Sequence, residues 1–184
     1  MFLNKKNLEV YCIDFKYFKT NKGERIITSN FIVKKDKNEG ATTKAKPKIN
    51  KKIFIEHVDE YVRDFFNKLF AFASENKMLL HWGSAGFLLN VDLSGNHVNI
   101  LYGYCSLSAV GLYISGVEIR RKINNAENLI DQYFEKLQST NLFKPASNEI
   151  KWVINKPINN QQVENILDSI LFVKNRIEAE GLIK

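Results

Sequence analysis

An alternating pattern centred on a short turn constrains the fold of this chain more than any other feature. Apolar and aromatic side chains occupy every second position on both sides of Ser94-Gly95-Asn96: Phe87, Leu89, Val91 and Leu93 before the turn, and Val98, Ile100, Tyr102 and Tyr104 after it. Alternation around a glycine-containing turn is typical of a β-hairpin with one buried face. We therefore expect residues 81–104 to form a hairpin in an antiparallel sheet, with each set sharing one face.

Three further segments read as strands. Residues 8–18 alternate, Thr20-Asn21-Lys22-Gly23 is a turn, and residues 25–33 are rich in Ile, Thr, Phe and Val, so 8–33 is expected to form an N-terminal hairpin. Residues 112–123 extend the central hairpin into a meander, and 149–155 add a later strand.

Apolar residues at steps of three and four predict helices over 54–76, 125–138 and 160–180. Asn124 followed by Glu127 resembles a capping box, and Gly181 is a typical residue after a helix end. The predicted class is α+β: an antiparallel β-meander with helices packed on one face. We expect a hairpin unit (1–33), a flexible lysine-rich linker (34–52) and a main domain (53–184).

The positive charge of the chain is concentrated in that linker. The net charge is +7, and residues 34–52 contribute +6 of it through eight lysines and two acids. The lysines are Lys34, Lys35, Lys37, Lys44, Lys46, Lys48, Lys51 and Lys52. Such a segment can bind the phosphates of DNA or RNA without reading sequence, and it can equally be a solvated linker. Arg120 and Arg121, on the expected third strand, form a second basic spot.

Composition excludes several classes of protein. No apolar run is long enough to cross a membrane, and residues 1–7 lack the apolar stretch of a signal peptide. The two cysteines, Cys12 and Cys105, cannot make a disulfide framework. We expect a cytoplasmic protein that does not engage a membrane.

Asp14 and Lys16 are the only catalytic candidates in the sequence. An acid and a lysine two positions apart share one face of a strand, where the acid can hold Mg²⁺ and the lysine can orient water. Such a nuclease site needs a second acid. Glu9 falls on the opposite face, and a site borrowing Asp92 is the remaining arrangement.

Two other patterns are candidates for binding. Gly83-Ser84-Ala85-Gly86 could cradle a phosphate, although a bend in a strand explains it as well. His81 and Trp82, with Gly83 and Gly86, are pocket candidates if both side chains face a concave sheet surface. His57, His81 and His97 lack the spacing of metal ligands, so we predict no metal site and no cofactor.

The sequence also resembles a module that follows nuclease-like domains of the PD-(D/E)XK superfamily in bacterial proteins. The resemblance lies in an amphipathic helix, a Trp-Gly-x-x-Gly-Phe strand (Trp82, Gly83, Gly86, Phe87) and a meander. The segments 13–18 and 23–27 are similar to the connector before that module. The resemblance implies a role in prokaryotic DNA processing or defence, and it carries over no active-site residue.

Three hypotheses about function follow. The first is a non-enzymatic module that contacts nucleic acid or a nuclease, with residues 34–52 as an electrostatic arm. The second is an unusual metal-dependent nuclease that uses Asp14 and Lys16 with Mg²⁺. The third is a protein-interaction module in which the 8–33 hairpin pairs with a partner or with a second copy of the chain.

Overall fold

The computed structural model describes residues 12–19, 25–32, 47–106, 109–147 and 149–182. The chain divides into two units, residues 1–45 and 46–184. The first unit holds β1 (Cys12–Lys19) and β2 (Arg25–Ile32), which pair antiparallel from Cys12↔Ile32 to Lys19↔Arg25. The predicted N-terminal hairpin is thereby confirmed.

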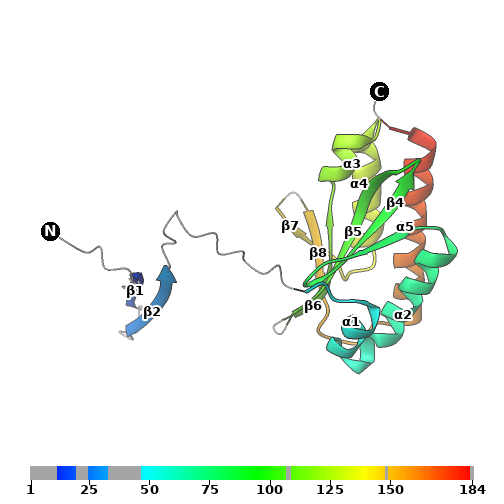
Figure 1. The fold of residues 1–184 in the computed structure, drawn as a ribbon. Coiled ribbons are helices and arrows are strands. Elements are labelled where there is room, and N and C mark those ends of the chain that lie inside the picture. Colours follow the sequence, from blue (N-terminus) through cyan, green and yellow to red (C-terminus); the bar gives the residue numbers. More distant parts are fainter. Residues whose placement is uncertain (1–11, 20–24, 33–46, 107–108, 148, 183–184) are drawn as a thin grey trace. The chain divides into compact units, whose positions relative to one another are not determined.

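The second unit is built on a six-stranded antiparallel sheet in the order β3-β4-β5-β6-β8-β7 (Figure 1). The strands are β3 (Leu79–Trp82), β4 (Gly86–Leu93), β5 (Asn96–Ser106), β6 (Ala109–Ser115), β7 (Lys144–Ala146) and β8 (Glu149–Val153). Four consecutive strands run side by side as a meander, and the helices fill one layer beside it. The α+β class, with a meander and helices on one face, is confirmed.

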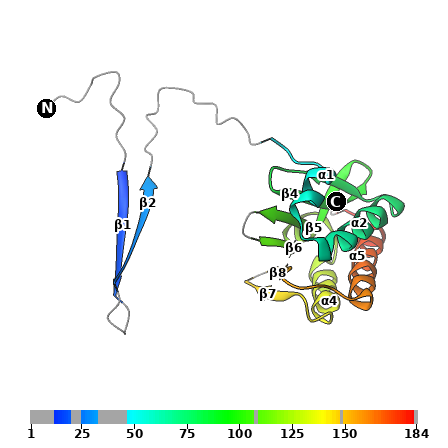
Figure 2. The same cartoon turned by 90° about the horizontal axis from the view of Figure 1, so that it is seen from below.

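One face of this sheet packs against three helices: α2 (Glu60–Glu75), α4 (Ala126–Gln138) and α5 (Asn160–Glu180). Figure 2 shows all three on the same side of the sheet. The Phe65 ring on α2 lies 5.5 Å from the Trp152 ring on β8, and the Tyr133 hydroxyl on α4 donates to the Ile100 carbonyl. The core therefore lies between the sheet and these helices, which leaves the other sheet face outside it.

A tight turn and a bulge shape the central hairpin. Ser94 and Gly95 both have positive φ, and the Asp92 carboxylate accepts from the Gly95 N–H at 2.8 Å, as a short hairpin turn requires. A β-bulge between Leu89 and Asn90 shifts the register of β4 and β5. The bulge places Val98 opposite Val91 in the core, whereas Tyr102 lies opposite Leu88 on the other face. The prediction that Val98 and Tyr102 share a face is therefore wrong, because a bulge breaks the period of two.

The predicted helix 54–76 is two helices, α1 (Lys51–His57) and α2. Val58 and Asp59 are extended between them, and Asp59 occupies the N-cap position of α2. The break lets the Phe54 ring pack 4.9 Å from Phe66 and 5.2 Å from Phe87. Lys51 and Lys52, assigned to the linker by sequence, belong to the first turn of α1.

The predicted strand 112–123 ends early. Strand β6 stops at Ser115, and α3 (Val117–Lys122) follows it. Ile119, on α3, is fully buried. Arg120 and Arg121 therefore lie on a helix and not on a strand, because one turn of helix buries Ile119 while keeping the basic side chains outside.

The predicted capping box at Asn124 is wrong. The N-cap of α4 is Asn125, whose backbone is left-handed and whose side chain makes no cap bond. Glu127 instead accepts from Arg120 at 2.8 Å. A capping box does occur at α5, where the Gln162 N–H donates to Asn159 Oδ1 at 2.8 Å. Gly181 ends α5 with a φ of 71°, as predicted.

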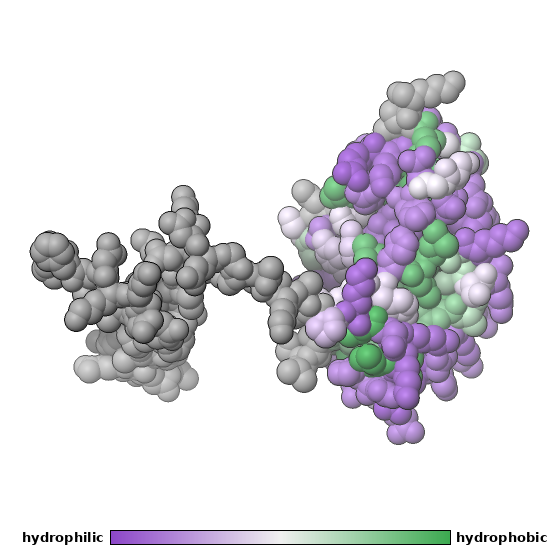
Figure 3. Space-filling model, in the orientation of Figure 1, coloured by the Kyte–Doolittle hydropathy of each residue, from purple (hydrophilic) through white to green (hydrophobic). Residues whose placement is uncertain are grey.

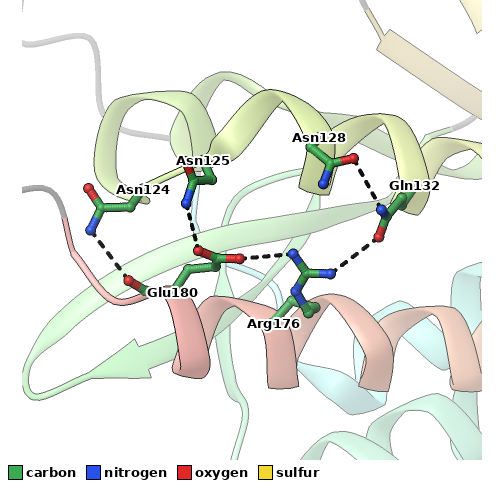
Figure 4. A network of polar contacts seen from close by, with 6 residues as sticks. All are labelled: Asn124, Asn125, Asn128, Gln132, Arg176 and Glu180. Atoms are coloured by element: carbon green, nitrogen blue, oxygen red, sulfur yellow. Dashed lines mark hydrogen bonds and ion pairs between the residues drawn. The ribbon is translucent and has the colours of Figure 1, made fainter.

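Polar contacts join the outer surfaces of α4 and α5 (Figure 4). Arg176 bonds to Gln132 on α4 and to Glu180 one turn further along α5. Asn125 donates to the other Glu180 oxygen, and these two bonds lower the pKa of the Glu180 carboxyl. The network aligns the two helices along the same face of the sheet. None of the helices in the described ranges has the length and apolar character needed to span a bilayer. In the view of Figure 3, the surface of the second unit is mostly hydrophilic, with smaller hydrophobic patches.

Candidate functional site

The sheet face opposite α2, α4 and α5, called the open face below, carries a continuous row of side chains across all six strands. Each member is the direct cross-strand partner of the next. From β7 to β3 the row reads Lys144, Lys151, Tyr113, Tyr102, Leu88 and His81. Direct partners have their Cβ atoms about 4.5–5.5 Å apart, so the row is one connected surface.

Tyrosines form the centre of this row. The rings of Tyr102 and Tyr113 are 5.3 Å apart and nearly perpendicular, and both are half-buried. Tyr104, two residues beyond Tyr102, lies over Gly111, where an added Cβ would come within 2.5 Å of its hydroxyl. Val153, the direct partner of Gly111, is 43% exposed on the same face. The centre of the open face is therefore aromatic and reachable from solvent.

The hydroxyl groups of these tyrosines stay protonated far above neutral pH. Burial, followed by a hydrogen bond to Glu149, raises the pKa of Tyr113 to about 12. Burial is also the main cause of the raised pKa values of Tyr102 and Tyr104. The row consequently offers neutral rings with hydroxyl donors.

The β7–β8 end of the open face is basic. Lys144 and Lys151 are direct cross-strand partners, and both are exposed. With Lys156 they line a pocket of about 250 Å³ at this edge of the sheet. Among the described residues, no carboxylate forms an ion pair with any of these three lysines, whereas Arg120, Arg121 and Lys122 all pair with glutamates.

The β3 end of the open face is polar. The rings of His81 and His97 are 5.0 Å apart, and the His81 ring contacts the Asn90 amide at 3.2 Å. His97 lies 3.8 Å from Asp92. Asn99, the direct partner of Asn90, is 4% exposed and donates to the carbonyls of Leu89 and Leu101. Within the described ranges, no set of His, Cys, Asp and Glu side chains could hold a metal ion.

The structure separates the pocket candidates predicted around His81. His81 is on the open face, whereas Trp82 faces the core, with its ring 5.6 Å from both Phe70 and Phe87. The two cannot share a surface, because neighbours on a strand point to opposite faces. Gly83 and Gly86 close the β3–β4 turn through a 2.8 Å hydrogen bond from Gly83 N–H to Gly86 carbonyl. The predicted strand through 81–93 is thus two strands, β3 and β4.

Most of the predicted basic segment lies outside the described residues, namely Lys34, Lys35, Lys37, Lys44 and Lys46. Lys48 is described and exposed. Lys52 pairs with Glu56 at 4.0 Å, and the Lys51 ammonium lies 5.6 Å from the Phe70 ring centre. Arg120 pairs with Glu127, and Arg121 with Glu118. These pairs partly neutralise the second basic spot.

The predicted catalytic pair falls on β1. The backbones of Asp14 and Lys16 pair with Asn30 and Thr28, and their side chains lie outside the described part of the chain. Asp92, the acid considered as a third member, accepts from the Gly95 N–H and supports the β4–β5 turn. Asp92 therefore has a structural role in the second unit, where it stabilises this turn.

Neither the tyrosine row nor the basic pocket is evident from the sequence alone. Alternation could have suggested that Tyr102, Tyr104 and Tyr113 lie on one face, because they are the polar aromatics of two consecutive strands. Lys144 and Lys151 carried no such signal, because β7 is three residues long and was not predicted.

Comparisons with known proteins found no matching family model, and no curated protein or solved structure that is significantly similar to this chain.

Proposed function

We propose that this protein binds single-stranded nucleic acid on the open face. The observation that supports the proposal is the cross-strand row, in which Tyr102 and Tyr113 sit at the centre and Lys151 and Lys144 follow at one end. Bases stack on aromatic rings while cationic side chains neutralise the backbone, and this combination accepts a strand without requiring one sequence.

The aromatic rings of the open face favour a single strand over a duplex. Stacking on Tyr102, Tyr104 or Tyr113 requires a base whose face is free, and in a duplex each base face is covered by its neighbours. A duplex would contact the protein through its phosphates alone, and the described open face carries its unpaired lysines at one end. We therefore expect single strands to bind more tightly than duplexes of the same sequence.

The lysine-rich segment 34–52 adds positive charge to the chain. It supplies +6 of the net +7, so it raises the affinity for any phosphate backbone and steepens the dependence on salt. Under this proposal the segment provides attraction, whereas the tyrosines discriminate between strand types. An association with a PD-(D/E)XK nuclease stays part of the proposal, as a partner that would act on the bound strand.

Fluorescence anisotropy tests the proposal. Labelled single-stranded and duplex DNA and RNA are titrated with the full chain at two salt concentrations. We expect single strands to bind more tightly than duplexes and binding to weaken as salt rises. Neutralising the lysines of 34–48 should lower the affinity for single strands and duplexes by similar factors. Absence of binding at low salt, or equal affinity for both strand types, would contradict the proposal.

The same samples address the nuclease hypothesis. Each titration is repeated with Mg²⁺, and the nucleic acid is run on a denaturing gel. We expect full-length strands. Shortened strands whose appearance depends on Mg²⁺ and is abolished in Asp14→Ala and Lys16→Ala would establish a nuclease instead.

A further inference from the structure

We propose that the pocket at the end of the β7–β8 ladder is a phosphate-binding site. The inference deepens the proposed function and rests on it for the source of the phosphate, a strand lying on the open face. The chemistry itself, recognition of one phosphate group by lysine side chains, does not depend on that source.

The pocket lies where the ladder between β7 and β8 ends. The ladder runs from Ala146↔Glu149 to Lys144↔Lys151, and the pocket lies beyond it. The pocket has a volume of about 250 Å³ and is lined by Lys144, Lys151 and Lys156, by Asn141 and Asn155, and by three apolar or aromatic residues that include Trp152. A pocket with three cationic and two amide side chains is suited to an anion with several oxygen acceptors.

Two positive charges lie directly opposite each other at this edge of the sheet. Like charges directly opposite each other on two strands destabilise a sheet, and Lys144 and Lys151 are in that arrangement. Several other cations form ion pairs: Lys174 pairs with Glu178, and Arg176 pairs with Glu180. Among the described residues, no carboxylate pairs with Lys144, Lys151 or Lys156. A bound anion would supply the missing negative charge.

The position of the pocket selects phosphate among anions. Lys151 is the direct partner of Tyr113, so the pocket adjoins the rings on which bases would stack. In a single strand, phosphates alternate with bases, and a phosphate in this pocket would place the neighbouring base beside Tyr113. Lysine binds phosphate well as a flexible point charge.

Trp152 gives a direct readout of the site. It lines the pocket, is 3% exposed, and is one of two tryptophans in the chain. In the Trp82→Phe variant, inorganic phosphate is titrated against sodium chloride at matched ionic strength while Trp152 fluorescence is recorded. We expect a saturable change with phosphate that chloride does not produce. Calorimetry of the unmodified chain with phosphate repeats the measurement if Trp82→Phe does not fold.

Paired lysine variants test the assignment. Lys144→Gln with Lys151→Gln should weaken phosphate binding by about tenfold or more. Lys68→Gln with Lys77→Gln removes the same charge from exposed positions on and after α2, and we expect no effect on phosphate binding from this control. A phosphate response equal to that of chloride, or lost equally in both double variants, would overturn the site.

Oligonucleotide titrations distinguish the source of the phosphate. If the strand supplies it, the Lys144 and Lys151 variant also lowers the affinity for a single strand, and the slope of log affinity against log salt becomes shallower by about one per lost contact. The other outcome is that the Lys144 and Lys151 variant loses phosphate binding but binds a single strand as tightly as the control variant does. That result would overturn the strand as the source of the phosphate, and the pocket would then bind free phosphate. Phosphate binding with no strand binding at all would overturn the proposed function but not the pocket.

Discussion

Tyr102 on β5 and Tyr113 on β6 are direct cross-strand partners, and their ring centres lie 5.3 Å apart. Because both side chains point away from the helices, this pair does not contribute to the core between sheet and helices. The pair is bordered by Leu88 on one side and Lys151 on the other. This relationship places a pair of tyrosine rings at the centre of the open face, next to its basic end.

Removing these rings should weaken binding of single strands. We expect Tyr102→Ala and Tyr113→Ala each to cost about 1–3 kcal/mol of binding free energy for every base that stacks there, while Tyr→Phe at the same positions keeps most of the affinity. Anisotropy with a labelled single strand measures both. The control is Tyr61→Ala, which removes an exposed tyrosine from α2. Equal losses in Tyr61→Ala and Tyr102→Ala would refute the role of the row.

Tyr113 should make the fold sensitive to alkaline pH. Its pKa is raised to about 12 from 10.0, so the folded state holds the proton more tightly than the unfolded state does. The stability that this preference contributes is complete below pH 10 and is lost as pH rises toward 12. Thermal unfolding of Tyr113→Phe should therefore depend less on pH across that window than unfolding of the unmodified chain. If the thermal unfolding of the two proteins depended on pH in the same way, the pKa of Tyr113 would be the same in the folded and unfolded states, which would contradict the prediction.

Gly86 should be far less tolerant of a side chain than Gly83. A Cβ on Gly86 would overlap the Gly103 carbonyl oxygen and lie 2.8 Å from Tyr104 Cα, whereas a Cβ on Gly83 would meet the Gly86 carbonyl oxygen at 3.7 Å. We expect Gly86→Ala to lower the free energy of unfolding by about 1–3 kcal/mol or more, and Gly83→Ala to change it by about 0.5 kcal/mol at most. Urea denaturation measures both. Equal effects of the two substitutions would contradict the close approach of β4 to β5 at Gly86.

Asn99 should be sensitive to a change that preserves its shape. Its amide donates at 3.2 Å to the carbonyls of Leu89 and Leu101, while its own oxygen is buried and, within the described residues, has no partner. Asn99→Asp replaces the donor with an acceptor against both carbonyls, so we expect a loss of more than about 3 kcal/mol at neutral pH. The loss should shrink in acid, where the new carboxyl is protonated. Asn96→Asp, at an exposed turn position, is the matched control and should be nearly neutral.

The helices and strands with a strong hydrophobic period could be predicted from the sequence. The alternation before Ser94 and the three- and four-residue steps of 160–180 both predicted their elements correctly, because hydrophobic burial alone determines them. Short elements were missed. β3 and β7 are four and three residues long, and α3 is six residues long. None of them repeats its period often enough for a hydrophobic pattern to be recognised.

The site could not be predicted in the same way, because it depends on register. Tyr102 reaches the open face only because the bulge at Leu89 and Asn90 separates it from Val98. Lys144 meets Lys151 only because β7 pairs with β8. Neither pairing is encoded by a local pattern, whereas the lysines of 34–52 are adjacent in sequence and were identified from composition alone.

Chemical-shift mapping of the isotope-labelled full chain during titration with a short single-stranded oligonucleotide tests the central claim most directly. We predict that the largest shifts fall on the open face, at Tyr102, Tyr113 and Lys151, with small shifts on α2, α4 and α5. Shifts confined to residues 34–52, or centred on the helices, would contradict the proposal that the open face binds the strand.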